Sequence, residues 1–124
     1  MKHPYADLIG FQVTDVSEGR STLEVEVRDE LMNPHRVVHG AVLYALADTG
    51  MGAALYSMLA ESEACATANC SINYFRPVSG GAITCITTVR HKGRNIATME
   101  SEIMNDGKLA ATANGQFSIF QMRR

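Results

Sequence analysis

Several motifs that often reveal a protein's function are missing from this chain of 124 residues. Its cysteines, Cys65, Cys70 and Cys85, are odd in number and match neither a metal-binding spacing nor a Cys-x-x-Cys pair. The sequence has no Gly-x-Ser-x-Gly turn, no glycine-rich phosphate loop and no His/Cys/Asp cluster with metal-ligand spacing. These absences argue against Ser-His-Asp chemistry and a metal centre. We therefore expect neither a metal nor an organic cofactor.

A strong charge of either sign is also missing. The formal net charge of −2 provides no field that would steer the protein toward DNA or an anionic membrane. The first ten residues are polar and interrupted by Pro4, so we expect no signal peptide there. The apolar stretch 37–60 contains Asp48 and glycines, which favours a buried helix over a membrane span. We expect a cytoplasmic protein with no nucleic-acid or membrane partner, whose cysteines are small buried apolar side chains.

The apolar residues, which make up 46% of the chain, predict one domain over 1–124 with a substantial core. From Arg20 to Arg28 apolar and polar residues alternate, which predicts a half-buried strand. Asp29 to Val37 is predicted to be a loop. From Val38 to about Leu59, apolar residues recur at steps of three and four. This spacing predicts a helix of ~20 residues, which is ~30 Å long.

Strands are predicted on both sides of this helix. A short helix or turn at 4–10 and strands at 11–16 and 20–28 precede it, and strands at 65–75, 82–91, 94–104 and 108–121 follow it. Asn105-Asp106-Gly107, between the last two strands, is typical of a tight hairpin. Because tight turns join antiparallel strands, we predict an α+β fold in which a curved antiparallel sheet wraps one long central helix. The small residues of that helix predict that another element packs very close to it.

The start of the long helix holds the residues with the clearest chemistry. His39-Gly40 stands where the helix should begin, and a helix N-terminus offers unpaired N–H groups and a partial positive charge to an anion or a developing oxyanion. Asp48 follows about two turns later among alanine, leucine and glycine. An unpaired carboxylate is costly to bury, so its presence there indicates a function. An oxyanion site and one carboxylate are the minimum equipment for attacking an acyl group.

These residues resemble the hotdog-fold acyl-CoA thioesterases, in particular the PaaI-type (phenylacetyl-CoA) and 4-hydroxybenzoyl-CoA branch. The resemblance covers nearly the whole chain through Leu8-Ile9-Gly10-Phe11, Glu18-Gly19-Arg20, Asn33-Pro34, His39-Gly40, Leu46-Ala47-Asp48, Asn73-Tyr74-Phe75-Arg76-Pro77 and Gly93-Arg94. It implies a hotdog fold and a homo-oligomer that is a dimer through edge strands and often a tetramer. It also implies an active site at the dimer interface, built from both subunits.

The resemblance assigns roles to five residues. Asp48 would attack the thioester carbonyl directly or act as general base for water, and the sequence does not separate the two. The Gly40 backbone N–H would bind the thioester oxygen, and His39 would help to fix this turn and could contact the substrate carbonyl. Asn33 would orient the water or the carbonyl, and Thr67 would hold the attacking water.

A basic set is expected near the nucleotide and phosphates of coenzyme A, because guanidinium and ammonium groups suit phosphate oxygens. By resemblance its members, with the glycine of the turn, are Arg76, Arg90, Lys92, Gly93 and Arg94. The acyl pocket is expected to be shaped by the partner subunit and by Tyr44, Met51, Met58 and Phe75. Two residues depart from the family pattern: Arg36 and Ala41 stand where the family has glycines. The Arg36 side chain leaves the loop conformation and the substrate range open, whereas the Cβ atom of Ala41 is tolerable if its face of the helix does not meet the substrate.

Three functions remain in competition. The leading hypothesis is hydrolysis of an acyl- or aroyl-CoA to the free acid and coenzyme A. A hotdog dehydratase or hydratase would instead use His39 and Asp48 as acid and base, but Asn33-Pro34 and the position of Asp48 fit the thioesterase branch better. The third hypothesis is a non-catalytic module that binds acyl-CoA, against which the intact acidic residue argues.

Overall fold

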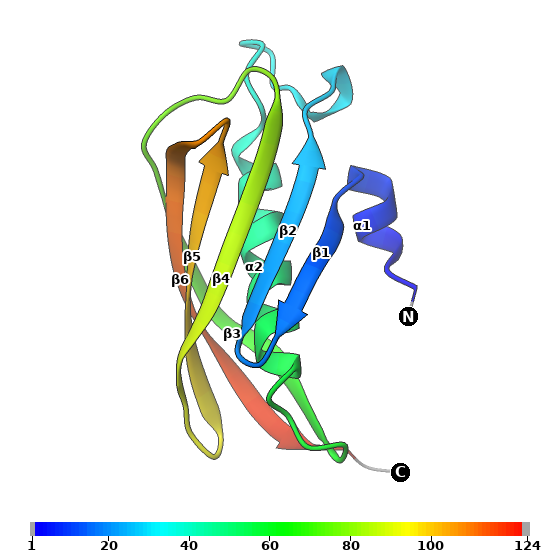
Figure 1. Cartoon of the computed structure of the whole chain (residues 1–124), viewed down its shortest axis with the longest axis vertical. Helices are drawn as coiled ribbons and strands as arrows, with labels where there is room; N and C mark the ends of the chain where they lie inside the picture. Colours follow the sequence, from blue (N-terminus) through cyan, green and yellow to red (C-terminus); the bar gives the residue numbers. More distant parts are fainter. Residues whose placement is uncertain (1, 123–124) are drawn as a thin grey trace.

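The computed structural model describes residues 2–122 and contains one long helix wrapped by a six-stranded sheet (Figure 1). In chain order the elements are α1 (Pro4–Ile9), β1 (Gln12–Ser17), β2 (Arg20–Glu26), a short 3-10 helix η1 (Asp29–Leu31), α2 (Gly40–Tyr56), β3 (Glu63–Tyr74), β4 (Ala82–Lys92), β5 (Ile96–Asn105) and β6 (Lys108–Gln121). The strand order is β1-β2-β4-β5-β6-β3, and every pair is antiparallel. The predicted α+β architecture is confirmed.

The core lies between α2 and the sheet, and α2 contacts all six strands. Leu46, Met51 and Leu55 of the helix are fully buried against sheet residues that include Leu23, Ile83, Cys85, Met99 and Ile103. Burial of each such side chain contributes roughly 1.5–3 kcal/mol. Among residues 2–122, no helix is long and apolar enough to cross a membrane.

Gly50 explains how α2 comes so close to the sheet. A Cβ atom at this position would lie 2.7 Å from the Oγ1 atom of Thr87 on β4. The Ser21 hydroxyl donates a hydrogen bond of 2.7 Å to the Gly50 carbonyl, and the hydroxyls of Thr87 and Ser101 lie 2.7 Å apart. The prediction that the small residues of the helix permit close packing is therefore confirmed at Gly50. Buried hydroxyls bonded in this way avoid the cost of unsatisfied polar groups.

The boundaries differ from the predicted ones where local hydrogen bonds intervene. The helix begins at Gly40 and not at Val38, because Val38 forms an isolated bridge with Met32 in the preceding loop. That loop, predicted to be irregular, contains η1. The hairpin between β5 and β6 is confirmed, since Asp106 (φ 49°) and Gly107 (φ 81°) both adopt the left-handed conformation of a type I′ turn.

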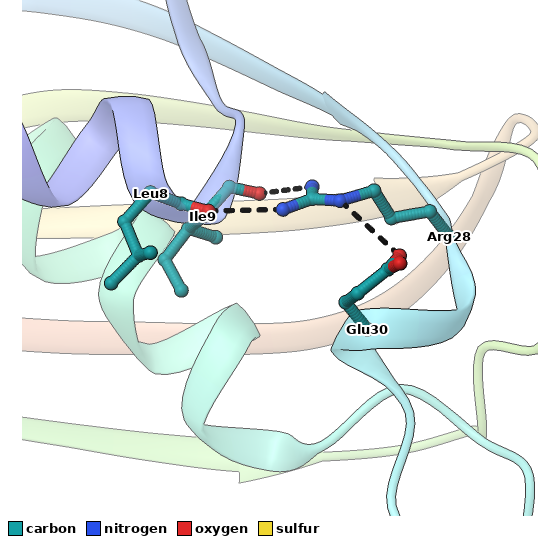
Figure 2. A network of polar contacts seen from close by, with 4 residues as sticks. All are labelled: Leu8, Ile9, Arg28 and Glu30. Carbon is teal, nitrogen blue, oxygen red and sulfur yellow. Dashed lines mark hydrogen bonds and ion pairs between the residues drawn. The ribbon is translucent and has the colours of Figure 1, made fainter.

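The N-terminal helix α1 is held against the end of β2 by Arg28, as Figure 2 shows. The Arg28 guanidinium donates to the carbonyl of Leu8 at 3.0 Å and to that of Ile9, and its Nε lies 3.6 Å from the Glu30 carboxylate. A cation at the C-terminal end of a helix also complements the helix dipole. This anchor matters because α1 buries only Ala6 in the core.

Candidate active site

Asp48 lies in the middle of α2, where the helix faces the edge strand β3. Its side chain is half-buried, and its Oδ1 atom accepts a hydrogen bond of 2.7 Å from the Thr67 hydroxyl. The register of β3 against β6 shifts between Thr67 and Asn69, so a β-bulge adjoins this contact. Bulges often redirect a side chain beside an active site. The structure thus brings together two predicted site residues that lie far apart in the sequence.

The Asp48–Thr67 pair borders a groove of about 580 Å³. Its lining combines small residues of α2 with aromatic side chains from several parts of the chain. Besides Asp48 and Thr67, the lining residues are His3, Tyr5, Val13, Thr49, Gly52, Ala53, Tyr56, Cys65, Ala66 and Phe117. A mostly apolar groove that contains one carboxylate is suited to an apolar ligand with a reactive polar group.

The N-terminus of α2 is capped by the residue before it. The His39 side chain accepts a hydrogen bond at Nδ1 from the Ala41 N–H (2.9 Å), and the His39 carbonyl accepts one from the Val42 N–H (2.9 Å). The hydrogen bonds within residues 2–122 include none from the Gly40 N–H. This N–H is therefore a free donor at the positive end of the helix dipole.

A second hollow, of about 350 Å³, opens at this helix end. It is lined by Val38, Gly40, Leu43, Tyr74, Phe75, Arg76, Pro77 and Val78. The Tyr74 hydroxyl donates a hydrogen bond of 2.7 Å to the Gly40 carbonyl. This hollow combines a backbone donor, apolar walls and one predicted cation, Arg76.

The two hollows are separate within one chain. Gly40 and Asp48 are eight positions apart on one helix, which corresponds to about 12 Å along its axis. Neither residue lines the hollow of the other. The predicted oxyanion donor and the predicted acid are thus not brought together by a single copy of the fold.

Asn33 organises the loop that leads to α2. Its side-chain oxygen accepts hydrogen bonds from the backbone N–H groups of His35 (2.8 Å) and Val37 (3.4 Å), which makes it an Asx-turn residue. Arg36, where the resemblance predicts a glycine, adopts a φ of 64°. The loop therefore has a left-handed residue that is not a glycine. The exposed Arg36 side chain forms an ion pair with Asp29, with 3.7 Å between Nη2 and Oδ1.

The predicted basic set is divided among three places. Arg76 lines the hollow at the N-terminus of α2, whereas 92–94 lie at the β4–β5 turn, at the opposite end of the sheet (Figure 1). Arg90 lies on the outer face of the sheet, where its Nε is 3.7 Å from the Glu100 carboxylate. One chain therefore does not gather these residues at a single phosphate site.

The cysteines are free, and only Cys85 is fully buried. The expectation of buried apolar side chains is therefore wrong for Cys65 and Cys70, which are half-buried, and Cys65 lines the groove beside Asp48. Burial raises the pKa of all three thiols, to about 11 for Cys85, and the Asp48 carboxylate adds to the rise at Cys70. A raised pKa opposes formation of the nucleophilic thiolate.

None of the four residues expected to shape the acyl pocket, Tyr44, Met51, Met58 and Phe75, lines the groove beside Asp48, and Phe75 lines the hollow at the N-terminus of α2. Met51 has no exposed surface and belongs to the core, and Met58 packs against the β1–β2 turn near Gly19. The expectation for the groove missed Tyr5 and Tyr56. Tyr56 could have been predicted from the sequence, because it follows Asp48 by about two turns of the same helix. Tyr5 could not, because only the fold brings α1 to this groove.

Comparison with known proteins finds relatives over most of this chain. Residues 35–111 match the family model of the thioesterase superfamily. The chain is 30% identical over 101 residues to the acyl-coenzyme A thioesterase PaaI of Escherichia coli (strain K12), which covers 81% of this chain and 70% of that one.

Solved structures show the same fold. A conserved protein from Pseudomonas aeruginosa matches with a TM-score of 0.93 at 31% identity, covering 97% of this chain and 96% of the other. The E. coli PaaI structure matches with a TM-score of 0.87 at 27% identity, covering 98% and 86%. The chain therefore belongs to the thioesterase superfamily and has its hotdog fold, as the sequence motifs implied.

Proposed function

We propose that this thioester hydrolase cleaves acyl- or aroyl-coenzyme A to the free acid and coenzyme A, without a metal or organic cofactor. The observation that supports this most directly is the Asp48–Thr67 hydrogen bond beside a largely apolar groove. Similarity to an E. coli protein named as an acyl-coenzyme A thioesterase supports the choice of substrate.

Asp48 provides the attacking group or activates it. Thr67 holds one carboxylate oxygen, so the other oxygen is oriented for a water molecule or for the thioester carbon. In the general-base route Asp48 takes a proton from water as the oxygen attacks the carbonyl carbon. The carbon–sulfur bond then breaks, and the coenzyme A thiolate leaves and takes up a proton. In the nucleophilic route the Asp48 carboxylate attacks the carbonyl carbon, the carbon–sulfur bond breaks as the coenzyme A thiolate leaves and takes up a proton, and a mixed anhydride remains. Water then hydrolyses the anhydride, which releases the free acid and regenerates Asp48.

The Gly40 N–H stabilises the negative charge that develops on the thioester oxygen. A preorganised donor of this kind is worth roughly 3–4 kcal/mol in the activation barrier. The position suits the role because the N–H is not used by the fold and lies at the positive end of α2. Asn33 shapes the loop before this end through its Asx turn, and His39 caps the helix.

The reaction requires Gly40 and Asp48 from different subunits. A reacting carbonyl must lie about 3–3.5 Å from both the attacking oxygen and the oxyanion donor. The separation of about 12 Å along α2 is too long for one thioester to meet both in the same chain. A two-fold axis perpendicular to α2 makes the two helices antiparallel, so that the N-terminus of one helix can face the middle of the other.

The edge strand β3 is the surface we assign to this dimer. It has twelve residues and exposes much of its length, and within residues 2–122 its one strand partner is β6. A long exposed edge strand presents unpaired backbone N–H and C=O groups that can pair with a strand of another chain. In a two-fold dimer, two copies of β3 would pair antiparallel. Further association into a tetramer is a prediction from family resemblance, as are the coenzyme A contacts of Arg90, Lys92, Gly93 and Arg94.

Hydrolysis assays test this function. Wild type and Asp48→Asn would be compared with aryl-, short- and medium-chain acyl-CoAs, with released coenzyme A corrected for the protein's own thiols. Asp15→Asn, an exposed carboxylate on β1, is the matched control. Turnover that Asp48→Asn abolishes and Asp15→Asn preserves supports the proposal. Binding of acyl-CoA without turnover by wild type would favour the binding module instead.

A further inference from the structure

We propose that Tyr74 is a positioning residue that fixes the orientation of the Gly40 N–H by holding the adjacent Gly40–Ala41 peptide group. This inference deepens the proposed function and rests on it. Tyr74 does not meet the reacting atoms in this arrangement, because its hydroxyl is bonded to the protein backbone.

The contacts hold the Gly40–Ala41 peptide group at both of its polar atoms. The Tyr74 hydroxyl donates to its oxygen at 2.7 Å, and its N–H donates to Nδ1 of His39 at 2.9 Å. The preceding peptide group is held as well, because the His39 carbonyl accepts from the Val42 N–H at 2.9 Å. Gly40 is therefore flanked by two fixed peptide planes, and its own N–H is the donor that remains.

Glycine makes such a clamp necessary. A glycine backbone is freer than that of any other residue, so a catalytic N–H on glycine loses orientation unless its neighbours are fixed. Glycine also leaves room for the tyrosine, because a Cβ atom on Gly40 would lie 3.0 Å from the Tyr74 hydroxyl oxygen and 3.1 Å from the ring carbon that bears it, so the tyrosine would have to shift. The two residues are thus matched: the tyrosine occupies the space that a side chain would need.

The series of hydrogen bonds from Tyr74 through the Gly40–Ala41 peptide group to His39 supports the same role. Burial raises the pKa of the Tyr74 phenol, so the hydroxyl remains a donor at neutral pH. A carbonyl that accepts a hydrogen bond polarises its peptide group and strengthens the N–H on the other side. With its Nδ1 accepting from Ala41, neutral His39 carries its proton on Nε2. The hydroxyl of Tyr74 therefore acts on both the Gly40 backbone and the capping histidine.

Tyr74→Phe tests the proposal, because it removes one hydroxyl and keeps the ring that fills the hollow. Loss of a neutral hydrogen bond of this kind predicts a decrease in kcat of roughly 2- to 10-fold, with KM nearly unchanged. Thr14→Val is the matched control, since it removes another hydroxyl-to-carbonyl bond (3.3 Å) on β1. The backbone amide resonances of Gly40 and Ala41 supply a second readout, which must move in Tyr74→Phe and stay in place in Thr14→Val.

An unchanged kcat with unmoved Gly40 and Ala41 resonances would overturn the clamp. A decreased kcat with unmoved resonances would also overturn it, because the hydroxyl would then act on the substrate itself. The proposed function fails separately, through full activity of Asp48→Asn. In that case the amide resonances alone still decide whether Tyr74 orients Gly40.

Discussion

The two catalytic regions of α2, its N-terminus and its middle, use different kinds of chemical group. At the N-terminus of α2 the active group is a backbone N–H, and the side chains around it, His39 and Tyr74, only hold the backbone in place. In the middle of α2 the active group is the Asp48 side chain, supported by a single hydroxyl from Thr67. Every substitution except proline keeps a backbone donor, whereas most substitutions of Asp48 remove its carboxylate. The two regions should therefore respond to mutation by very different amounts.

The largest effect is expected in the middle of the helix. Asp48→Asn removes the general base or nucleophile but keeps the shape of the side chain. We expect kcat to fall by roughly a hundredfold or more, about 3 kcal/mol in the barrier. Rates of coenzyme A release measure this effect, and a decrease smaller than tenfold would contradict the role of Asp48.

At the N-terminal end, Gly40→Ala disturbs the oxyanion donor without deleting it. The added Cβ would stand 3.0 Å from the Tyr74 hydroxyl, so either the tyrosine or the helix end must shift. We expect kcat to fall by roughly 10- to 100-fold, because part of the oxyanion stabilisation is lost. Gly80→Ala is the control, since a Cβ there meets no atom within 4 Å. Equal activities of these two variants would refute the assignment of Gly40.

The sequence reveals these two regions unequally. The hairpin at Asp106-Gly107, the strand from Arg20 and the helix around Asp48 follow from local periodicity and turn chemistry, which depend on neighbouring residues. The contacts Thr67–Asp48 and Tyr74–Gly40 join β3 to α2 across 19 and 34 positions. Family resemblance predicted a role for Thr67 but did not predict the hydrogen bond from Tyr74 to the Gly40 carbonyl. No local sequence pattern shows which hydroxyl will reach a given carbonyl.

The predicted basic set shows the same limit. Arg76 and Arg94 were grouped by family resemblance, yet the antiparallel path of the chain puts them at opposite ends of the sheet. Met51 was assigned to a pocket because of its chemistry, but helical phase places it in the core. Residue type indicates what a side chain can do, and the fold decides what it faces.

A smaller effect on catalysis is expected at Thr67. Thr67→Val removes the hydroxyl that orients Asp48 and keeps the β-branched shape on the strand. We expect kcat to fall roughly tenfold, because a charge-assisted hydrogen bond is lost while the carboxylate remains. Thr67→Ser, which retains the hydroxyl, should stay close to wild type. If the valine and serine variants have the same kcat, Thr67 does not orient Asp48.

The smallest effect concerns the loop before Gly40. Arg36→Gly removes a side chain from a residue with φ 64°, where L-residues are strained by about 1 kcal/mol. We expect the free energy of unfolding to rise by roughly 0.5 kcal/mol, since the greater freedom of unfolded glycine offsets part of the gain. Denaturant unfolding measures this change. Asp29→Asn removes the exposed ion pair alone and should change little. A less stable Arg36→Gly variant would contradict the strain argument.

Hybrid dimers test the central claim that one site uses Gly40 of one subunit and Asp48 of the other. Asp48→Asn and Gly40→Ala chains, each nearly inactive alone, would be refolded together, with differently tagged subunits to verify that hybrids form. Each hybrid then contains one intact site, so an equal mixture should recover about a quarter of wild-type activity. No recovery in verified hybrids would show that Gly40 and Asp48 do not act across a subunit interface, and would contradict the account.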